Sequence, residues 1–253
     1  FDIAGAYLHS IKKKPQLMSI GKEIATMMIQ EDKTLKQYIT DKGEIIVDLK
    51  KCLYGLKESG LEWYKLVSEF ILSLGFQRSS FDHCLYSLHQ NGELISMIVL
   101  YVDDILLCAK DESISKWFEE QVKERFGNYT TKEGNNLSYL GMEIEYDNEK
   151  TTVKQTGYTK KIIEEFLNKD SATAKTPTDT NFFIDRELNQ CEDTTGLFLR
   201  LVMLLMYLAI RTRGDILLAT TVLATKSAHP TEEDFNKAIR IVKYLKRTLD
   251  YGL

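Results

Sequence analysis

Two adjacent carboxylates, Asp103 and Asp104, interrupt the apolar stretch MIVLYVDDILLCA that spans residues 97–109. Apolar runs on both sides of a polar dipeptide that can turn predict a β-hairpin buried on at least one face. Ionised carboxylates at the end of such a hairpin are costly unless a cation or hydrogen bonds compensate their charge. The pair therefore indicates either a divalent-metal site for phosphoryl chemistry or a solvated acidic turn, and the hairpin alone does not decide between them.

A third carboxylate stands near the start of the chain. The segment FDIAGAYLH places Asp2 within a short apolar stretch and Tyr7 five residues later. Three carboxylates from two strands could bind two metal ions, one activating a 3′-hydroxyl and the other holding a triphosphate. The two motifs together favour the metal-site interpretation over the acidic turn.

The motifs resemble those of a known family, in that family's order. FDIAGAYL is similar to the first catalytic motif of reverse transcriptases, and YVDD resembles their polymerase motif. Between them, LKKCLYGLKESGLEWY (49–64) resembles the LYGLKQSPRxWY segment of copia-type (Pseudoviridae) LTR retrotransposon reverse transcriptases. Later segments are similar to others of that lineage, namely YLGMEIE (139–145), QTGYTKKIIEEF (155–166), RLVMLLMYLAIRTRGDI (200–216) and AIRIVKYLKRT (238–248). The chain thus looks like a fragment of a copia-type Pol polyprotein.

This resemblance implies a role for each candidate residue. The catalytic residues would be Asp2, Asp103 and Asp104, which would bind two Mg²⁺ ions, or Mn²⁺, together with the backbone carbonyl of Ile3. Tyr7 matches the family's aromatic steric gate, whose ring would clash with a ribonucleotide 2′-hydroxyl. The remaining candidates are Gly55 and Lys57 for nucleotide binding, and Ser59 and Tyr101 for template or primer contact.

The sequence departs from the family pattern at several positions. Glu58 and Gly60 stand where the family often has Gln and Pro, which places a carboxylate near the expected nucleic acid. Met203 replaces a glycine, which predicts overpacking of a helix contact by ~1–3 kcal/mol. Gly214 replaces a proline, and Gly141 within an expected strand predicts either close backbone approach or a bulge.

Composition excludes several classes of function. No run reaches the ~18 apolar residues of a membrane span, and the first residues lack a basic secretory leader. The four cysteines show no CxxC spacing, which argues against a zinc ribbon or a redox pair, and Cys108 is expected to be a small buried hydrophobe. The net charge of −4 argues mildly against a nucleic-acid binder. Three basic sets weaken that objection, namely Lys12–Lys14, Lys50 with Lys51, and the set Lys237, Arg240, Lys243, Lys246 and Arg247. The last set falls mainly along one expected helix and could track phosphates or simply be solvated.

Hydrophobic periodicity predicts an α+β fold. Up to residue 155 we expect strands at 44–49, 84–88, 97–109, 138–146 and 151–155, with helices at 63–74 and 114–126, the latter capped by Ser113. Helices are expected to cover one face of a largely antiparallel sheet. Beyond 155 we expect helices at 157–168, 195–210, 214–226 and 231–249, with a linker or mobile loop at 169–194.

We therefore expect residues 1–155 to form a reverse transcriptase palm with partial fingers, and 156–253 a helical thumb or connection region. Most of the fingers are expected to be missing, which would leave this truncated chain inactive. The expected partners are RNA and DNA template or primer, deoxynucleoside triphosphates, and neighbouring integrase and ribonuclease H regions of a polyprotein, with no membrane. The expected location is intracellular, in a cytoplasmic virus-like particle or the nucleus.

Two other interpretations stay open at this point. One is a non-catalytic remnant that keeps the polymerase fold and at most binds nucleic acid. The other is a different palm-fold enzyme such as a nucleotide cyclase, against which the LYGLKES and YLKRT segments argue.

Overall fold

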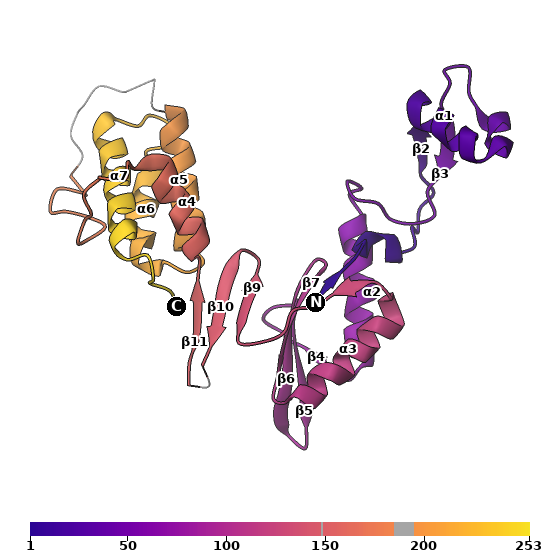
Figure 1. Cartoon of the computed structure of the whole chain (residues 1–253), viewed down its shortest axis with the longest axis horizontal. Helices are drawn as coiled ribbons and strands as arrows, with labels where there is room; N and C mark the ends of the chain where they lie inside the picture. Colours follow the sequence, from indigo (N-terminus) through magenta and orange to yellow (C-terminus); the bar gives the residue numbers. More distant parts are fainter. Residues whose placement is uncertain (148, 185–194) are drawn as a thin grey trace. The chain divides into compact units, whose positions relative to one another are not determined.

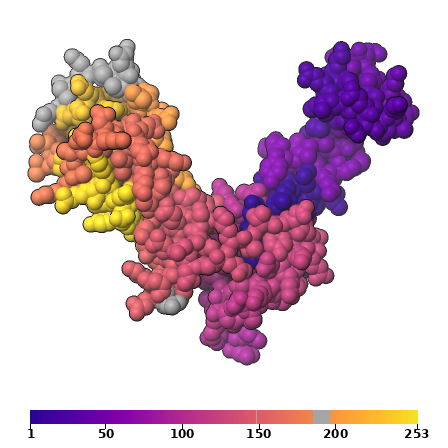
Figure 2. Space-filling view, viewed as in Figure 1, coloured from indigo at the N-terminus to yellow at the C-terminus, as the bar shows by residue number. Residues whose placement is uncertain are grey.

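The computed structural model describes residues 1–147, 149–184 and 195–253, and the remaining residues are drawn in grey (Figure 1 and Figure 2). The described chain forms two compact units, Phe1–Lys132 and Glu133–Leu253. Each unit has a hydrophobic core made of its own residues. The unit boundary lies before the strands at 136–154, whereas we placed the palm–thumb division at 155. That functional division stays a prediction.

The first unit is built on a six-stranded antiparallel sheet with the order β4-β5-β6-β7-β1-β8. Its strands are β1 (Asp2–Ile3), β4 (Gln77–Arg78), β5 (Leu85–Gln90), β6 (Glu93–Tyr101), β7 (Asp104–Ala109) and β8 (Tyr129–Thr130). Helices α2 (Ser59–Ser73) and α3 (Glu112–Phe126) pack against this sheet (Figure 1). The expected α+β architecture with antiparallel sheets is confirmed.

Periodicity explains why these segments form these elements. Along β6, Ser96, Ile98 and Leu100 are buried while the residues between them are more exposed, which is the period of two of a strand with one face on the core. On α2, Trp63, Val67 and Ile71 recur at four-residue spacing and face the same core.

The segment between residues 10 and 43 holds elements that we did not predict. One of them is strand β2 (Leu17–Ile20), which pairs with β3 (Ile45–Asp48) in a two-stranded ribbon. Strand β3 itself confirms the strand expected at 44–49. Between β2 and β3 lie helix α1 (Lys22–Glu31) and the 3-10 helix η2 (Lys33–Tyr38). Helix α1 buries Ala25 alone, so its sequence carries little of the apolar periodicity that identifies a packed helix.

The second unit combines a three-stranded antiparallel sheet with a helical bundle. The sheet consists of β9 (Asn136–Tyr139), β10 (Met142–Tyr146) and β11 (Thr151–Lys154). The helices are α4 (Thr156–Phe166), α5 (Thr195–Ala209), η4 (Gly214–Ile216), α6 (Leu217–Ala224) and α7 (Glu232–Arg247). Thr231 and Asp234 form a capping box at the start of α7, which confirms the helix entry expected there.

Part of the expected linker is packed. Residues 169–184 contain no helix or strand, yet Ala174 and Phe182 are buried in the helical core. Residues 185–194, including Cys191, lie outside the described part of the chain.

Two local predictions are wrong. The expected strand at 138–146 is a tight hairpin, because Tyr139 pairs with Met142 around Leu140 and Gly141, both with positive φ (50° and 76°). A two-residue turn requires left-handed backbone, and glycine adopts that conformation easily. Gly141 is therefore explained by the turn, and not by the close approach of another backbone to a strand. The cap of α3 is Asp111, whose carboxylate accepts hydrogen bonds from the backbone N–H groups of Ser113 and Ile114, so the expected Ser113 cap is also wrong.

Two side chains point outward where we expected burial. Met203 on α5 is 46% exposed, so the predicted overpacking does not occur. Cys108 on β7 is exposed, so it is not a buried hydrophobe. Among the described residues, no helix combines the length and apolar character that crossing a bilayer requires.

Candidate active site

Strand β1 brings Asp2 beside the acidic hairpin. It pairs with β7 on one side and β8 on the other, and Asp2 lies directly opposite Asp104 in the register. The Ile3 N–H donates to the Asp103 carbonyl (3.1 Å), and the Ile105 N–H donates to the Phe1 carbonyl (2.7 Å). Residues separated by about 100 positions in the sequence are thus held together by the sheet itself.

Alternation along the two strands turns the carboxylates away from the core. Ile3 and Ile105 are 0% and 1% exposed and belong to the hydrophobic core of the first unit. Successive side chains of a strand point to opposite faces, so Asp2 and Asp104 share the other face. Directly opposed residues have Cβ atoms about 4.5–5.5 Å apart, which suits joint binding of one cation.

Asp103 occupies a strained two-residue turn. Tyr101 pairs with Asp104, which leaves Val102 and Asp103 at the tip of the β6–β7 hairpin. Val102 has φ 54°, a region that a β-branched residue rarely adopts and that costs of the order of 1–3 kcal/mol. The Asp103 carboxylate accepts a hydrogen bond from the Tyr54 hydroxyl (3.2 Å).

The three carboxylates interact electrostatically. Burial raises the pKa of the Asp104 carboxyl above its usual range, and the negative charges of Asp103 and Asp2 raise that pKa further. Burial likewise raises the pKa of Tyr54, with a contribution from the Asp103 charge. A cation bound among these groups would relieve the repulsion between like charges.

The donor set suits a hard divalent cation, because carboxylate and backbone carbonyl oxygens are the ligands that Mg²⁺ prefers. Among the described residues, however, no group of three or more His, Cys, Asp or Glu side chains is arranged to hold a metal ion. Asp103 is engaged with Tyr54 instead. The chemistry of the site therefore fits a metal, whereas the side chains would have to converge further to coordinate one.

Tyr7 lies next to this site through an aromatic contact. It belongs to the 3-10 helix η1 (Ala6–His9), is half-buried, and its ring centroid lies 4.4 Å from that of Tyr54. A Cβ atom at Gly60 would lie 3.8 Å from the Tyr7 hydroxyl. The structure therefore joins Tyr7, Tyr54 and Asp103 in one continuous group. Our sequence reasoning assigned no role to Tyr54, although its place in LYGLKES beside a glycine was an available signal.

The loop that precedes α2 is shaped by Gly55 and Ser59. Gly55 has φ 94° and a Cβ there would meet no atom within 4 Å, so this position needs glycine for its backbone conformation and not for space. Ser59 is 1% exposed and its hydroxyl donates to the Leu53 carbonyl (2.7 Å), which closes the loop. Lys57 in this loop is exposed, and Tyr101 on the hairpin is 53% exposed.

The atypical Glu58 has a partner within the unit. It forms an ion pair with Lys12, whose side chain is 1% exposed. Hydrogen bonding to Lys12 lowers the pKa of the Glu58 carboxyl. Lys13 pairs with Glu62 at 3.2 Å. Much of the first basic set is thus neutralised by neighbouring carboxylates, which weakens the idea that it tracks phosphates.

The basic residues of α7 hold the segment 169–184 in place. Lys246 donates to the Lys169 and Ser171 carbonyls (2.7 and 3.0 Å), and Arg240 donates to the Thr176 hydroxyl (3.3 Å). Lys237 donates to the Ile184 carbonyl (3.3 Å). Three of the five basic side chains that we expected either to track phosphates or to be solvated therefore bind the segment 169–184.

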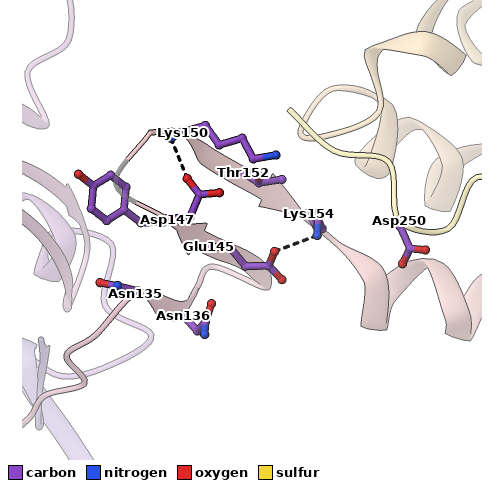
Figure 3. Close-up of a pocket in the computed structure, with 9 residues that line it drawn as sticks. Asn135, Asn136, Glu145, Asp147, Lys150, Thr152, Lys154 and Asp250 are labelled. Carbon is purple, nitrogen blue, oxygen red and sulfur yellow. Dashed lines mark hydrogen bonds and ion pairs between the residues drawn. The ribbon is translucent and has the colours of Figure 1, made fainter.

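The second unit contains a polar pocket of about 650 Å³ on its small sheet (Figure 3). Three of its charged side chains have partners: Glu145 pairs with Lys154 (2.9 Å), and the Asp147 carboxylate accepts a hydrogen bond from the Lys150 backbone (3.0 Å). No predicted site residue lines it. The acidic hairpin is therefore the stronger candidate for catalysis.

Comparison with known proteins agrees with the motifs. The profile of the family described as "Reverse transcriptase (RNA-dependent DNA polymerase)" matches residues 23–180, a range that includes the acidic hairpin. The Pol polyprotein from transposon RE1 of Arabidopsis thaliana is 31% identical over 219 residues, which cover 84% of this chain and 14% of that protein. The transposon Ty1-DR1 Gag-Pol polyprotein of Saccharomyces cerevisiae is 27% identical over 228 residues, covering 82% of the chain and 12% of the polyprotein.

A third relative, the Pol polyprotein from transposon RE2 of Arabidopsis thaliana, is 28% identical over 214 residues. These residues cover 84% of this chain and 14% of that protein. The chain thus spans about one seventh of the length of the first curated relatives that it matches. No solved structure matches it significantly.

Proposed function

The chain belongs to the reverse transcriptase family of copia-type Pol polyproteins, and we propose that it contributes the nucleotidyl-transfer site that extends a primer 3′ end with deoxynucleotides on an RNA template. The observation that supports this most is the register of β1, which sets Asp2 opposite Asp104, one residue from the Asp103 turn. The three carboxylates identified from sequence therefore come from neighbouring positions of one sheet.

Phosphoryl transfer requires little covalent chemistry from the protein. It depends on the positioning of the reacting groups and on the neutralisation of the negative charge on the phosphates. Two Mg²⁺ ions, or Mn²⁺, would supply that neutralisation when held by Asp2, Asp103, Asp104 and the Ile3 carbonyl. Tyr7 would lie beneath the incoming sugar and exclude a 2′-hydroxyl, with Gly55 and Lys57 near the nucleotide. Ser59 would act by closing its loop, and Tyr101 presents an exposed ring toward a primer.

In this proposal residues 1–155 form the palm with partial fingers, and residues 156–253 a thumb or connection region. The substrates are deoxynucleoside triphosphates and an RNA or DNA template with its primer. Neighbouring integrase and ribonuclease H regions of a polyprotein would be partners. Primer extension would take place in a cytoplasmic virus-like particle or in the nucleus.

A second candidate is a non-catalytic remnant that keeps the fold and at most binds nucleic acid. It is favoured by the Tyr54 hydrogen bond to Asp103 and by the unconverged carboxylates in the described part of the chain. Metal binding does not distinguish the two candidates, because either could retain it.

Template-directed primer extension separates them. The polymerase extends a primer on an RNA template with Mg²⁺ and deoxynucleotides, and Asp103→Asn abolishes the product. The remnant shifts a primed template in a binding assay and extends nothing, whether or not Asp103 is present.

A further inference from the structure

A buried tryptophan is hydrogen-bonded to the hairpin turn that carries Asp103. Trp63 on α2 is 1% exposed, and its indole Nε1–H donates to the Val102 carbonyl (2.5 Å). The indole offers one donor and no acceptor, so the only polar group of this side chain is used on the turn. The ring itself belongs to the hydrophobic core of the first unit.

The hydrogen bond from Trp63 is made to a strained part of the hairpin turn, and it can control how that turn is oriented. Val102 is held at φ 54°, and conformations of this kind persist only where the surroundings determine them. The Val102 carbonyl belongs to the planar peptide that joins Val102 to Asp103. Fixing that carbonyl fixes the orientation of the peptide, and with it the direction in which the Asp103 side chain leaves the backbone.

Other contacts hold the indole ring in place. Phe126 at the end of α3 packs edge-to-face on Trp63, with ring centroids 5.5 Å apart. His9 lies 6.1 Å away on another side, and its Nε2 is 3.3 Å from the Ala4 carbonyl. Trp63 therefore contacts both the Asp103 turn and the segment that follows Asp2.

We propose that Trp63 is a positioning residue for the carboxylate site, holding the Val102–Asp103 peptide in its strained orientation through the indole N–H. This role rests on the proposed polymerase function. It differs from ordinary core packing in one respect: it depends on the N–H group, whereas packing depends on the ring.

Indole NMR tests the contact without any activity assay. The chain has two tryptophans, so ¹⁵N labelling gives two indole N–H resonances, and Trp117→Phe assigns them without altering Trp63. The Trp63 N–H should be protected from solvent exchange, and Mg²⁺ with a primed template should shift its resonance but not that of Trp117. Asp103→Asn should abolish this shift. An unprotected Trp63 N–H, or a Trp63 resonance indifferent to Asp103, overturns the proposal.

A double-mutant cycle tests the positioning role in the primer-extension assay, with each variant placed in the chain preceded by the corresponding upstream segment of the RE1 polyprotein. Trp63→Phe keeps an aromatic ring but loses the donor, and it should lower kcat about tenfold while KM for the primed template stays within about twofold. Val102→Gly removes the backbone strain, so in that background Trp63→Phe should lower kcat by less than about threefold. The matched variant Trp117→Phe should leave kcat unchanged in both backgrounds.

The outcomes separate this proposal from the function on which it rests. Primer extension that survives Trp63→Phe in full, or falls by the same factor in both backgrounds, overturns the positioning role while the polymerase assignment stands. If neither the unsubstituted chain nor the chain preceded by the corresponding upstream segment of the RE1 polyprotein extends a primer, and neither shows a Mg²⁺-dependent shift, the polymerase function fails and the role of Trp63 fails with it.

Discussion

Two residues of the candidate site are held in conformations or surroundings that are unfavourable for their residue type. Val102 adopts a backbone conformation that suits glycine, and Asp104 lies where burial and two neighbouring negative charges raise its pKa. Strain and repulsion of this kind are found at functional sites more often than elsewhere in proteins. They are the residue-level features that favour a working site over an ordinary acidic turn.

Tyr7 gives a prediction at this scale. Tyr7→Ala should raise the efficiency of ribonucleotide addition relative to deoxynucleotide addition by roughly tenfold or more, because the ring that excludes a 2′-hydroxyl is removed. The measurement is the ratio of kcat/KM for the two nucleotides. Tyr7→Phe is the matched control, since it keeps the ring and should keep the selectivity. If wild type, Tyr7→Ala and Tyr7→Phe all show the same selectivity, Tyr7 does not exclude ribonucleotides by steric clash.

Sequence identified some of these residues but missed others for a physical reason. Asp2, Asp103 and Asp104 stand in local motifs whose residue types report their chemistry. Tyr54 and Trp63 acquire their roles only through contacts with the hairpin about 40 to 50 positions away, the Asp103 carboxylate and the Val102 carbonyl. The motif LYGLKES could have drawn attention to Tyr54, but no local pattern identifies the partner of either side chain, so the structure was needed to find both contacts.

At the scale of elements, the N-cap residue of α2 is joined to the segment between η1 and β2 through a buried cation. The Lys12 side chain is almost fully buried and is paired with Glu58. Glu58→Gln should lower the melting temperature measurably, because it leaves a buried ammonium without an opposite charge. The double variant Lys12→Met/Glu58→Gln should recover most of the loss, since it removes the charge as well. A double variant no more stable than the single one would contradict this explanation of Glu58.

The C-terminal end of α7 is fixed by a second buried cation. Arg213 is 2% exposed and makes two hydrogen bonds to Asp215 (2.9 and 2.8 Å) and two to Thr248. Tyr244 also donates to Asp215 (2.8 Å). Burial raises the pKa of Asp215, but the hydrogen bonds from Arg213 and Tyr244 and the Arg213 charge outweigh it, so the pKa lies below its usual range.

This arrangement predicts a pH-dependent stability. Asp215→Asn should reduce the free energy of unfolding at pH 7 by about 3 kcal/mol, the low end for breaking a buried pair, because Asp215 itself is partly exposed. A carboxyl with a lowered folded-state pKa stabilises the fold above its unfolded pKa of about 3.9, and that contribution is lost as the pH falls through the folded pKa.

Urea unfolding of both proteins between pH 7 and pH 2 checks this prediction. The difference between wild type and Asp215→Asn should stay constant down to about pH 4 and shrink below it. Asp170→Asn, at an exposed position, makes the same charge change and should leave stability unchanged within about 0.5 kcal/mol. A difference independent of pH would show that Asp215 does not act through its charge.

The elements themselves were predictable where periodicity was strong. Helices α2, α3 and α7 bury a regular apolar face, and their positions follow from that pattern. The β9–β10 turn was missed because Leu140 is not a residue that signals left-handed backbone, although Gly141 beside it is. Strand β2 and helix α1 were missed because they bury little beyond Ala25, whereas β3 coincides with the strand expected at 44–49.

At the scale of the whole molecule, the described chain consists of two units with separate hydrophobic cores. All the candidate catalytic residues lie in the first. In the second unit, Lys237, Arg240 and Lys246, which belong to the basic set considered for phosphate contact, donate hydrogen bonds to the segment 169–184. Sequence resemblance anticipated the family and the α+β class, whereas the boundary between compact units depends on tertiary contacts that no single motif reports.

The central claim is that the acidic hairpin and Asp2 form a nucleotidyl-transfer site. Its most direct test is primer extension on an RNA template with Mg²⁺, using this chain alone and this chain preceded by the corresponding upstream segment of the RE1 polyprotein. The account predicts template-directed addition of deoxynucleotides by the extended protein, lost in Asp103→Asn and retained in Asp170→Asn. Product that is unaffected by Asp103→Asn, or no product from protein shown to be folded, would contradict it.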